Sequence, residues 1–505
     1  MNNFELLMQG FGTALSFVNL AVAIGGGILG LFVGAMPGLG AVTGVALLLP
    51  MTFKMNPTTA IIFLCGVYFG NMYGGAYSAI LLNIPGDSPA VMTAMDGFPL
   101  SKKGKAGKAL FTANASSFIG GVFGIITLTI FGPMLAKVGL KFGPAEVTAL
   151  ILLALTSIGW LLGDDPIKGI VASALGILIS TIGLDMMAGG LPRYTFGSVS
   201  LMGGISFIPL VIGMFGMTQV MELMTSKQSD SLVTGRRLTL RESFLDRKDI
   251  KRIGMPVLKG SVLGNFIGFL PGAGGTTASF LAYVFEKKTN KKGDQMGKGM
   301  IEGVAVSESA NNAAAVGAFI PLLCLGIPGS ATAVVLLGGL MMWGLQPGPL
   351  LFLEQSDFVW GLIGSMYIGN LACIVVGLVM IPFLMSILRI PRGIMAPIIV
   401  TICIVGSYSI KNNLFDVWFM IGAGIVAYIL KKHDYPIPPI LLAFVLAPRF
   451  EQSIRRAFTI SHGSPLIFFQ KPISAFLLGL TLIFILAPVV MKIAAKAKNR
   501  KGAVM

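Results

Sequence analysis

Long apolar stretches recur along this chain and are separated by short polar or basic segments. A helix needs about 20 residues to cross a bilayer, and six of the stretches are that long or nearly so. They are Gly120 to Ala136, Val147 to Leu162, Ile167 to Met187, Phe358 to Leu388, Ile394 to Ile410 and Ile473 to Ala494. With shorter interrupted segments, the pattern predicts roughly 10 to 14 membrane elements. We therefore expect an all-α polytopic membrane protein.

The apolar segments that contain Pro-Gly occur twice in the same order. VGAMPGLGAVTG (Val33 to Gly44) aligns with IGFLPGAGGTTA (Ile267 to Ala278), 234 positions later. NIPGDSPAV (Asn83 to Val91) aligns with GIPGSATAV (Gly326 to Val334), 243 positions later. These ordered pairs predict two structural repeats with broken, re-entrant helices, a first membrane repeat over 15–224 and a second over 255–495.

Equivalent loops of the two repeats differ in charge. The loop after the first Pro-Gly segment, 51–57, has one lysine, whereas its counterpart has five between 287 and 298. After the second segment, four lysines lie between 102 and 108, whereas 346–357 has two acids and no base. Because basic loops stay in the cytoplasm, the repeats are predicted to be inverted in topology. Residues 225–254 would form a basic cytoplasmic connector and 496–505 a basic cytoplasmic tail.

The Pro-Gly segments are the predicted substrate site. A backbone break at membrane depth is tolerated only where it is buried in protein or lines a watery cavity. Each break starts a new helix, whose unpaired amide hydrogens and partial positive charge suit an anion. Nearby hydroxyls would either cap these helices or bind the ligand. The predicted contacts are Pro37, Gly38, Leu39, Gly40, Thr43, Asn83, Pro85, Gly86, Asp87, Ser88, Pro271, Gly272, Ala273, Gly274, Gly275, Thr276, Thr277, Pro328, Gly329 and Ser330.

These segments lack basic side chains. No Lys or Arg occurs in 31–53, 55–100, 260–286 or 299–388, so a bound anion would rely on amides, hydroxyls and a co-bound cation. The candidates for cation or proton coupling are Asp87, Glu308, Asn311 and Asn312. Two interpretations stay open for Asp87, which would also cap the helix starting near Ser88. The same holds for Ser307 to Asn312, which would also suit a polar helix start at the interface.

Composition, charge and motifs exclude several other classes of protein. The chain has 505 residues, of which 54% are apolar and 11% charged, as in a polytopic membrane protein. Its net charge of +16 comes from loops between apolar segments, so no nucleic acid is expected as a partner. The four cysteines lack the spacing of a disulfide framework or metal site. No Walker motif, nucleophile elbow or metal-ligand cluster occurs, so we expect neither an enzyme nor a cofactor beyond a coupling ion. The first hydrophobic segment lacks the features of a cleavable signal and is expected to stay.

Several long motifs carry a family resemblance. EGVAVSESANNAAAVGAFIPLLCLGIPGSATAVVLLGGLMMWGLQPGP (Glu302 to Pro349), with MPGLGAVTGVALLLP, YGGAYSAILLNIPGDSPAVMTAMDGFPL and FLPGAGGTTASFLAYVFEKK, resembles the large membrane subunit of the bacterial tripartite tricarboxylate transporters. The similarity covers nearly the whole chain. It implies a multi-pass permease of the bacterial inner (cytoplasmic) membrane that imports citrate-like tri- and dicarboxylates, driven by a Na+ or H+ gradient. It also implies a small membrane subunit and a periplasmic substrate-binding protein as partners.

Two other functions fit the same residues. A stand-alone carboxylate symporter would transport without partners, whereas an anion channel would conduct without saturation. For the permease, we expect alternating access, in which the four Pro-Gly segments and Ser307 to Asn312 bind a carboxylate and a cation.

Overall fold

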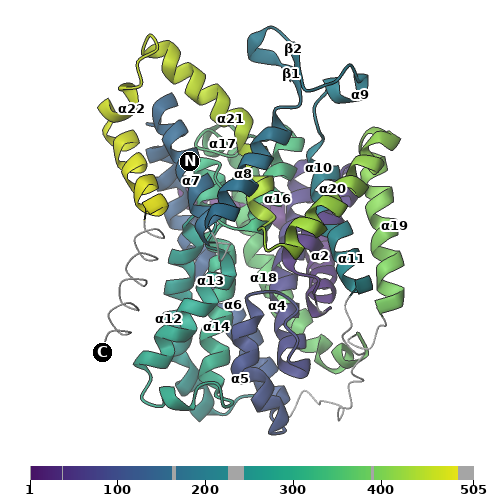
Figure 1. Ribbon diagram of the computed structural model, residues 1–505. Coiled ribbons are helices and arrows are strands. Elements are labelled where there is room, and N and C mark those ends of the chain that lie inside the picture. Colours follow the sequence, from purple (N-terminus) through teal and green to yellow (C-terminus); the bar gives the residue numbers. More distant parts are fainter. Residues whose placement is uncertain (1, 37, 162–165, 226–243, 388–391, 487–505) are drawn as a thin grey trace, which may run out of the picture. The chain divides into compact units, whose positions relative to one another are not determined.

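The computed structural model describes residues 2–36, 38–161, 166–225, 244–387 and 392–486, which are mostly helical (Figure 1). The sheet in this part of the chain is one antiparallel pair, β1 (Gly183–Asp185) and β2 (Leu191–Arg193). The prediction of an all-α polytopic membrane protein is confirmed. Pro37, most of the predicted connector and the predicted tail lie outside the described residues.

Seven of the described helices are long and apolar enough to cross a membrane. They are Phe17–Ala35, Pro57–Leu82, Ala106–Gly139, Phe207–Thr225, Ser356–Ile381, Gly393–Lys411 and Leu414–Lys432. Shorter apolar helices are Ala41–Thr52, Pro144–Ser157, Ile167–Ser180, Ala331–Met342 and Pro472–Leu486.

The chain forms two compact units, each made from two separate parts of the sequence. Unit 1 comprises Met1–Gly139 and Ser206–Tyr428, and unit 2 comprises Leu140–Ile205 and Ile429–Met505. Each unit thus contains residues of both predicted repeats. The repeat boundaries at 15–224 and 255–495 stay predictions.

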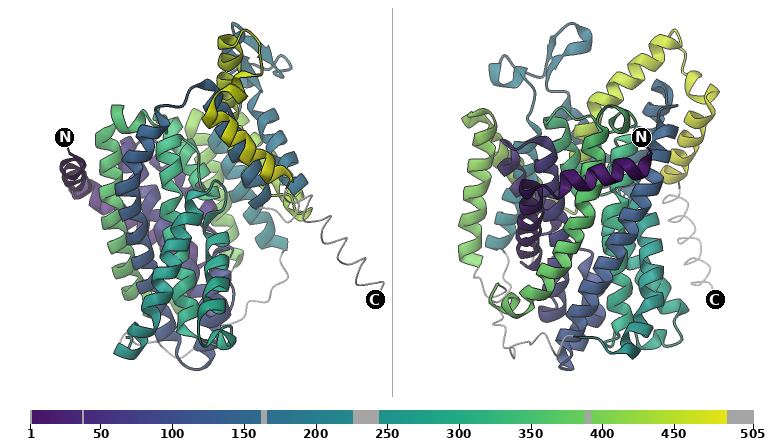
Figure 2. Two further views of the ribbon diagram at one scale, coloured as in Figure 1. Left: turned by 90° about the vertical axis from the view of Figure 1, so that its left-hand side faces the viewer. Right: turned by 180° about the vertical axis from the view of Figure 1, so that it is seen from behind.

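Unit 1 contains all four Pro-Gly segments. Its helices before the connector are α1 (Asn3–Ala14), α2 (Phe17–Ala35), α3 (Ala41–Leu48), η1 (Leu49–Thr52), α4 (Pro57–Leu82), α5 (Ala90–Lys102), α6 (Ala106–Gly139), α10 (Phe207–Val211), the π-helical η3 (Ile212–Met217) and α11 (Thr218–Thr225). The next helix, α12 (Arg247–Phe269), begins within the last residues of the predicted connector. It is followed by α13 (Gly274–Thr289), η5 (Gly293–Gln295), α14 (Ile301–Gly317), α15 (Phe319–Leu325), α16 (Ala331–Met342), α17 (Leu351–Glu354), α18 (Ser356–Ile387), α19 (Arg392–Lys411) and most of α20 (Leu414–Lys432). Helix α1 lies across the long helices of this unit (Figure 2).

Local sequence signals set the ends of the helices around the Pro-Gly segments. Asn56 caps α4 by accepting a hydrogen bond from the Thr58 amide at 3.0 Å, and Pro57 occupies the first helical position. At its other end, α4 stops at Asn83, whose φ of 58° is left-handed. Gly326 ends α15 in the same conformation, with a φ of 73°. In each half, the second Pro-Gly segment therefore begins with a residue in the left-handed conformation.

Glycine-lined faces bring α2 onto α4 and α12 onto α14. Three glycines in α2 and three in α12 approach carbonyl oxygens so closely that an added Cβ would lie no more than 2.5 Å from the oxygen. The glycine–carbonyl pairs are Gly26–Phe63, Gly30–Val67 and Gly34–Asn71 in the first set, and Gly260–Val306, Gly264–Ala310 and Gly268–Ala314 in the second. The offsets between these sets are the 234 and 243 positions of the sequence alignment. The two halves thus share a packing pattern as well as motifs.

Loops of unit 1 meet non-equivalent loops of the other half. The Lys103 ammonium donates a hydrogen bond to the Lys298 carbonyl at 2.6 Å, so the loop after α5 lies beside the loop after α13. A Cβ on Gly361 would lie 3.7 Å from Thr58 Cγ2, so the starts of α4 and α18 are adjacent. Such pairing is expected of inverted repeats, because equivalent loops then lie on opposite sides. The inverted topology stays a prediction, which these contacts support.

Unit 2 consists of helices and the small sheet, which lies between α8 and α9 in the chain. Its elements are α7 (Pro144–Leu161), α8 (Pro166–Ser180), β1, η2 (Met186–Ala188), β2, α9 (Val199–Met202), α21 (Pro438–Ile460), α22 (Ile467–Gln470) and the helix Pro472–Leu486. Helix α21 packs against α8, because a Cβ on Gly176 would lie 2.0 Å from the Ile440 carbonyl oxygen. It is also joined to α7 by a 3.0 Å hydrogen bond between the hydroxyls of Thr148 and Ser453.

Candidate substrate and ion site

Asp87 joins the first two Pro-Gly segments. Helix α3 begins after Gly40, which has no side chain to cap it. The Asp87 carboxylate accepts hydrogen bonds from the backbone amides of Ala41, at 3.3 Å, and Ser88, at 2.8 Å. It therefore caps α3, the helix of the neighbouring segment, whereas the sequence suggested a cap for the helix near Ser88. A carboxylate has about four lone-pair positions, so capping leaves room for a further ligand.

The third and fourth segments are also in direct contact. The Gly272 amide donates a hydrogen bond to the Gly329 carbonyl at 3.1 Å. Gly272 has a φ of 81°, which a residue with a side chain rarely adopts. Ser330, at the position equivalent to Asp87, caps its own helix α16 by accepting a hydrogen bond from the Ala333 amide at 3.2 Å.

Segments of the second half contact the first half. The Ser330 hydroxyl lies 3.4 Å from that of Tyr68, a residue of α4 outside the Pro-Gly segments, within hydrogen-bonding distance. A Cβ on Gly275 would lie 3.2 Å from Cγ of Pro89, the residue before α5. The four segments therefore meet within unit 1, as a shared site requires.

The equivalent starts of α3 and α13 differ in charge. The start of α3 has the Asp87 carboxylate, whereas the nearest neighbours of Gly274 and Gly275 at the start of α13 are Ser330, Asn311 and Pro89, all neutral. Thr276 in the first turn of α13 is exposed. A helix N-terminus with no carboxylate beside it, flanked by hydroxyls, is the better anion site of the two.

Glu308 is a fully buried carboxylate with neutral partners. It lies on α14 and accepts hydrogen bonds from the hydroxyls of Thr93, on α5, and Ser117, on α6, the latter at 3.1 Å. No ion pair to Glu308 occurs among the described residues. Burying an ionised carboxylate without a countercharge costs several kcal/mol. The site therefore suits a proton or a metal cation.

The two candidate asparagines behave differently. The Asn311 oxygen, Oδ1, lies only 2.5 Å from where a Cβ of Gly275 would be, and it has no hydrogen-bond partner among the described residues. The Asn312 amide instead donates a hydrogen bond to the Glu308 carbonyl of its own helix at 3.1 Å. Asn311 is therefore brought to the Pro-Gly segments, whereas this bond keeps the Asn312 amide within α14.

The other predicted contacts differ in accessibility. Asn83, Ser88 and Thr276 are exposed, and Thr277 is half-buried. Thr43 is buried, with 7% of its surface exposed. The exposed hydroxyls of Ser88 and Thr276 are thus the more accessible ones.

Sequence reasoning missed several polar residues of this region. Tyr68, Asn71, Thr93 and Ser117 contact the predicted site residues, yet none lies in a Pro-Gly segment. The available signal was their polarity within otherwise apolar helices, with Asn71 having none of its surface exposed.

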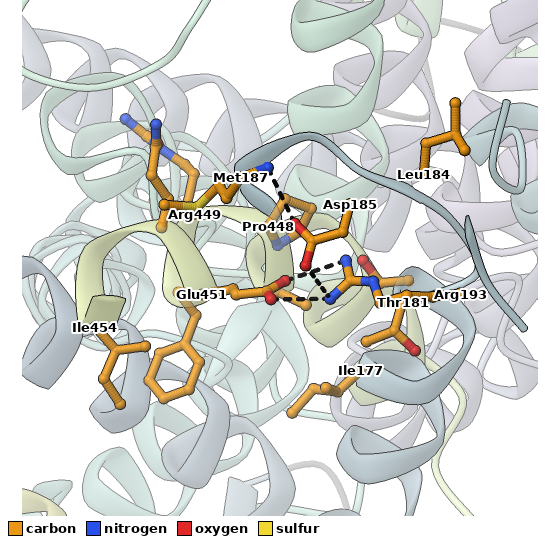
Figure 3. Close-up of a pocket in the computed structure, with 14 residues that line it drawn as sticks. Ile177, Thr181, Leu184, Asp185, Met187, Arg193, Pro448, Arg449, Glu451 and Ile454 are labelled. Atoms are coloured by element: carbon orange, nitrogen blue, oxygen red, sulfur yellow. Dashed lines mark hydrogen bonds and ion pairs between the residues drawn. The ribbon is translucent and has the colours of Figure 1, made fainter. Parts of the chain in front are cut away.

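A cavity of about 550 Å³ lies in unit 2 and is lined by none of the predicted site residues. On its wall Arg193 donates a hydrogen bond to Glu451 at 2.9 Å (Figure 3). Arg455, which does not line the cavity, donates to Asp185 at 3.0 Å, and the two bonds anchor the sheet to α21. Burial alone would raise the pKa of Asp185. The hydrogen bond from Arg455 and those from the Met187 and Ala188 amides instead hold this pKa below its ordinary value. These acidic and basic side chains are thus paired with one another.

Comparisons with known proteins agree with the motifs. The family model described as "Tripartite tricarboxylate transporter TctA family" matches residues 20–442. An "Uncharacterized 52.8 kDa protein in TAR-I ttuC' 3'region" of Agrobacterium vitis is 40% identical over 496 residues, covering 98% of each chain. An "Uncharacterized protein in TAR-II ttuC' 3'region" of the same organism is 42% identical over 233 residues, 46% of this chain and 96% of its own. No solved structure matches the chain.

Proposed function

Because this chain belongs to the tripartite tricarboxylate transporter TctA family, we propose that it is the permease subunit of a binding-protein-dependent importer of tricarboxylates or related carboxylates. Its proposed partners are a small membrane subunit and a periplasmic substrate-binding protein, and its proposed location is the bacterial inner membrane. The seven apolar helices support a multi-pass protein.

The observation that carries the substrate proposal is the meeting of four Pro-Gly segments that contain no basic side chain. The carboxylate substrate binds at the start of α13, where the backbone amides of Gly274 and Gly275 and the hydroxyls of Thr276 and Ser330 act as donors. Asp87 makes the equivalent start of α3 less favourable for an anion. The substrate is therefore held asymmetrically, mainly by the second half.

The transport mechanism that we propose is cation-coupled alternating access. Glu308 takes up the coupling ion, because its carboxylate is buried beside the Pro-Gly segments and has no basic partner among the described residues. The repeated glycine packing and the pairing of non-equivalent loops support two inverted repeats that expose the site alternately.

Uptake into liposomes tests this function. The full chain is reconstituted with its small membrane subunit, with the binding protein added outside, and uptake of radiolabelled citrate and succinate is measured. We expect saturable uptake that needs both the binding protein and an imposed Na+ or H+ gradient. Uptake without a gradient would contradict the coupling.

The same preparation separates the alternatives. Equal uptake with and without the binding protein would favour a stand-alone symporter. A carboxylate current that does not saturate in planar bilayers would favour a channel.

A further inference from the structure

Asn71 has a buried oxygen atom without a partner. The residue lies on α4 with none of its surface exposed. Its amide nitrogen, Nδ2, donates a hydrogen bond to the Leu39 carbonyl at 3.3 Å, whereas Oδ1 has no hydrogen-bond partner among the described residues. Leaving a buried acceptor without a partner destabilises the fold, and a bound cation or water would remove that cost.

The C-terminal end of α2 lies against Asn71. A Cβ on Gly34 would lie 2.2 Å from the Asn71 carbonyl oxygen, so the two backbones touch there. The Met36 amide makes the last helical hydrogen bonds, to the Phe32 and Val33 carbonyls. The Gly34 carbonyl oxygen lies against Gly86 of the second Pro-Gly segment, where an added Cβ would be 1.9 Å from it. Gly34 and Ala35 are at the helix end that has partial negative charge.

A carboxylate lies beside Asn71 and the end of α2, and we call this region the corner. Gly75 lies one helical turn after Asn71 on α4, and a Cβ there would be 3.3 Å from Cβ of Asp87. The Asp87 carboxylate also contacts Gly40 and Ala41, next to the Leu39 that holds Asn71. The corner thus gathers an amide oxygen, a carboxylate and backbone carbonyls from three elements.

We propose that this corner binds a small monovalent cation such as Na+, with Asn71 Oδ1 and Asp87 as ligands alongside the carbonyls at the end of α2. One carboxylate among neutral oxygens favours a monovalent ion, because protein sites for divalent ions generally supply more negative charge. The equivalent positions in the second half are Ala314 and Ser330, which supply neither an amide nor a carboxylate. The cation site therefore belongs to the first half and is separate from Glu308.

This inference rests on the proposed function in one respect, since it adds a second cation, besides the ion at Glu308, to cation-coupled transport. Its test needs neither carboxylate nor partners: thermal unfolding of the purified full chain in lipid nanodiscs, with NaCl replacing choline chloride at constant ionic strength. We expect the unfolding temperature to rise with NaCl until saturation. In Asn71→Ala, the NaCl concentration at half effect should rise roughly 10-fold or more, as for loss of a group that supports a metal site.

Three further variants serve as checks on this test. Asn71→Asp retains an oxygen ligand and should keep Na+ binding if the alanine variant does not fold. Asn265→Ala is the matched control, because Asn265 is also buried and its amide donates to a carbonyl, that of Ala313 at 3.4 Å. Its half-effect concentration should stay that of the wild type. Repeating the titration in Glu308→Gln isolates this corner from Glu308.

Two results would overturn the site. One is a wild-type unfolding temperature that is the same in NaCl and choline chloride. The other is a normal Na+ response in Asn71→Ala, as expected if a water molecule satisfies Oδ1. Failure of carboxylate uptake with an intact Asn71-dependent Na+ response would instead reject the proposed function and leave the cation site standing.

Discussion

The hydroxyl of Thr93 donates a hydrogen bond to the carboxylate of Glu308, and the two residues come from different halves of the chain. Thr93 lies on α5, directly after the second Pro-Gly segment, and Glu308 lies on α14. This hydrogen bond connects the Glu308 carboxylate to the helix that follows a Pro-Gly segment. Through it, a change at the carboxylate would reach the proposed substrate site.

Replacing Glu308 by Gln should block coupled transport without unfolding the protein. Gln keeps the size and can still bond the two hydroxyls, so the free energy of unfolding should change by about 1 kcal/mol or less. Because the variant cannot ionise, uptake should fall by roughly 100-fold and lose its dependence on the cation gradient. Glu302→Gln is the control on the same helix, since Glu302 pairs with Arg252 at 2.8 Å and should leave uptake measurable. Gradient-driven uptake in Glu308→Gln would reject this role.

Replacing Gly272 or Gly274 by Ala should abolish uptake while membrane insertion persists. Their φ angles of 81° and 58° are left-handed, which costs alanine about 1–2 kcal/mol per residue. The strain displaces the start of α13, where we place the anion. Gly104→Ala is the control, because Gly104 has a similar φ of 75° in a loop with open space around it. Normal uptake in both variants would mean that this segment only connects two helices.

Alanine at Gly30 or Gly264 should destabilise the protein by similar amounts. Each new Cβ would lie 2.1–2.3 Å from a carbonyl oxygen, so the helices must separate, at a cost of about 1–3 kcal/mol. Thermal unfolding in detergent measures the change. Gly25→Ala adds a Cβ with nothing within 4 Å and should have little effect. A large loss for only one of the pair would argue against equivalent packing.

Introduced cysteines test the inverted topology. A cysteine at Lys54 should react with an impermeant thiol reagent from outside intact cells, whereas one at Lys292 should react only after the cells are opened. The native cysteines, Cys65, Cys324, Cys373 and Cys403, are all buried and should give a low background. Labelling of both sites from the same side would contradict inverted repeats.

The Asp185 network should give unit 2 an acid-sensitive anchor. Because the folded pKa of Asp185 is lowered, its stabilising contribution is present above the ordinary Asp pKa of about 4 and is lost as pH falls through the folded value. Proteolysis of the chain around β1 and β2 should therefore increase below about pH 4. Asp185→Asn should be cleaved readily at neutral pH as well. Asp434→Asn, whose carboxylate is largely exposed, should behave as wild type.

The sequence predicted the helical class, because apolar length is a local signal. The repeated motifs indicated the four Pro-Gly segments, whose contacts with one another are long-range. The sequence did not predict that Asp87 caps α3, since that contact joins residues 46 positions apart. Asn71 and Thr93 were missed because single polar residues in apolar helices show their importance only when their partners are known. The division into two discontinuous units likewise depends on long-range contacts that no local pattern records.

The glycine contacts between α2 and α4, and between α12 and α14, constrain how the protein can move. In each contact a carbonyl oxygen lies against a glycine, so no layer of side chains can adopt new rotamers and let one helix slide past the other. Each helix pair should therefore move as one rigid body. Any rearrangement should then occur in the short segments between the helices.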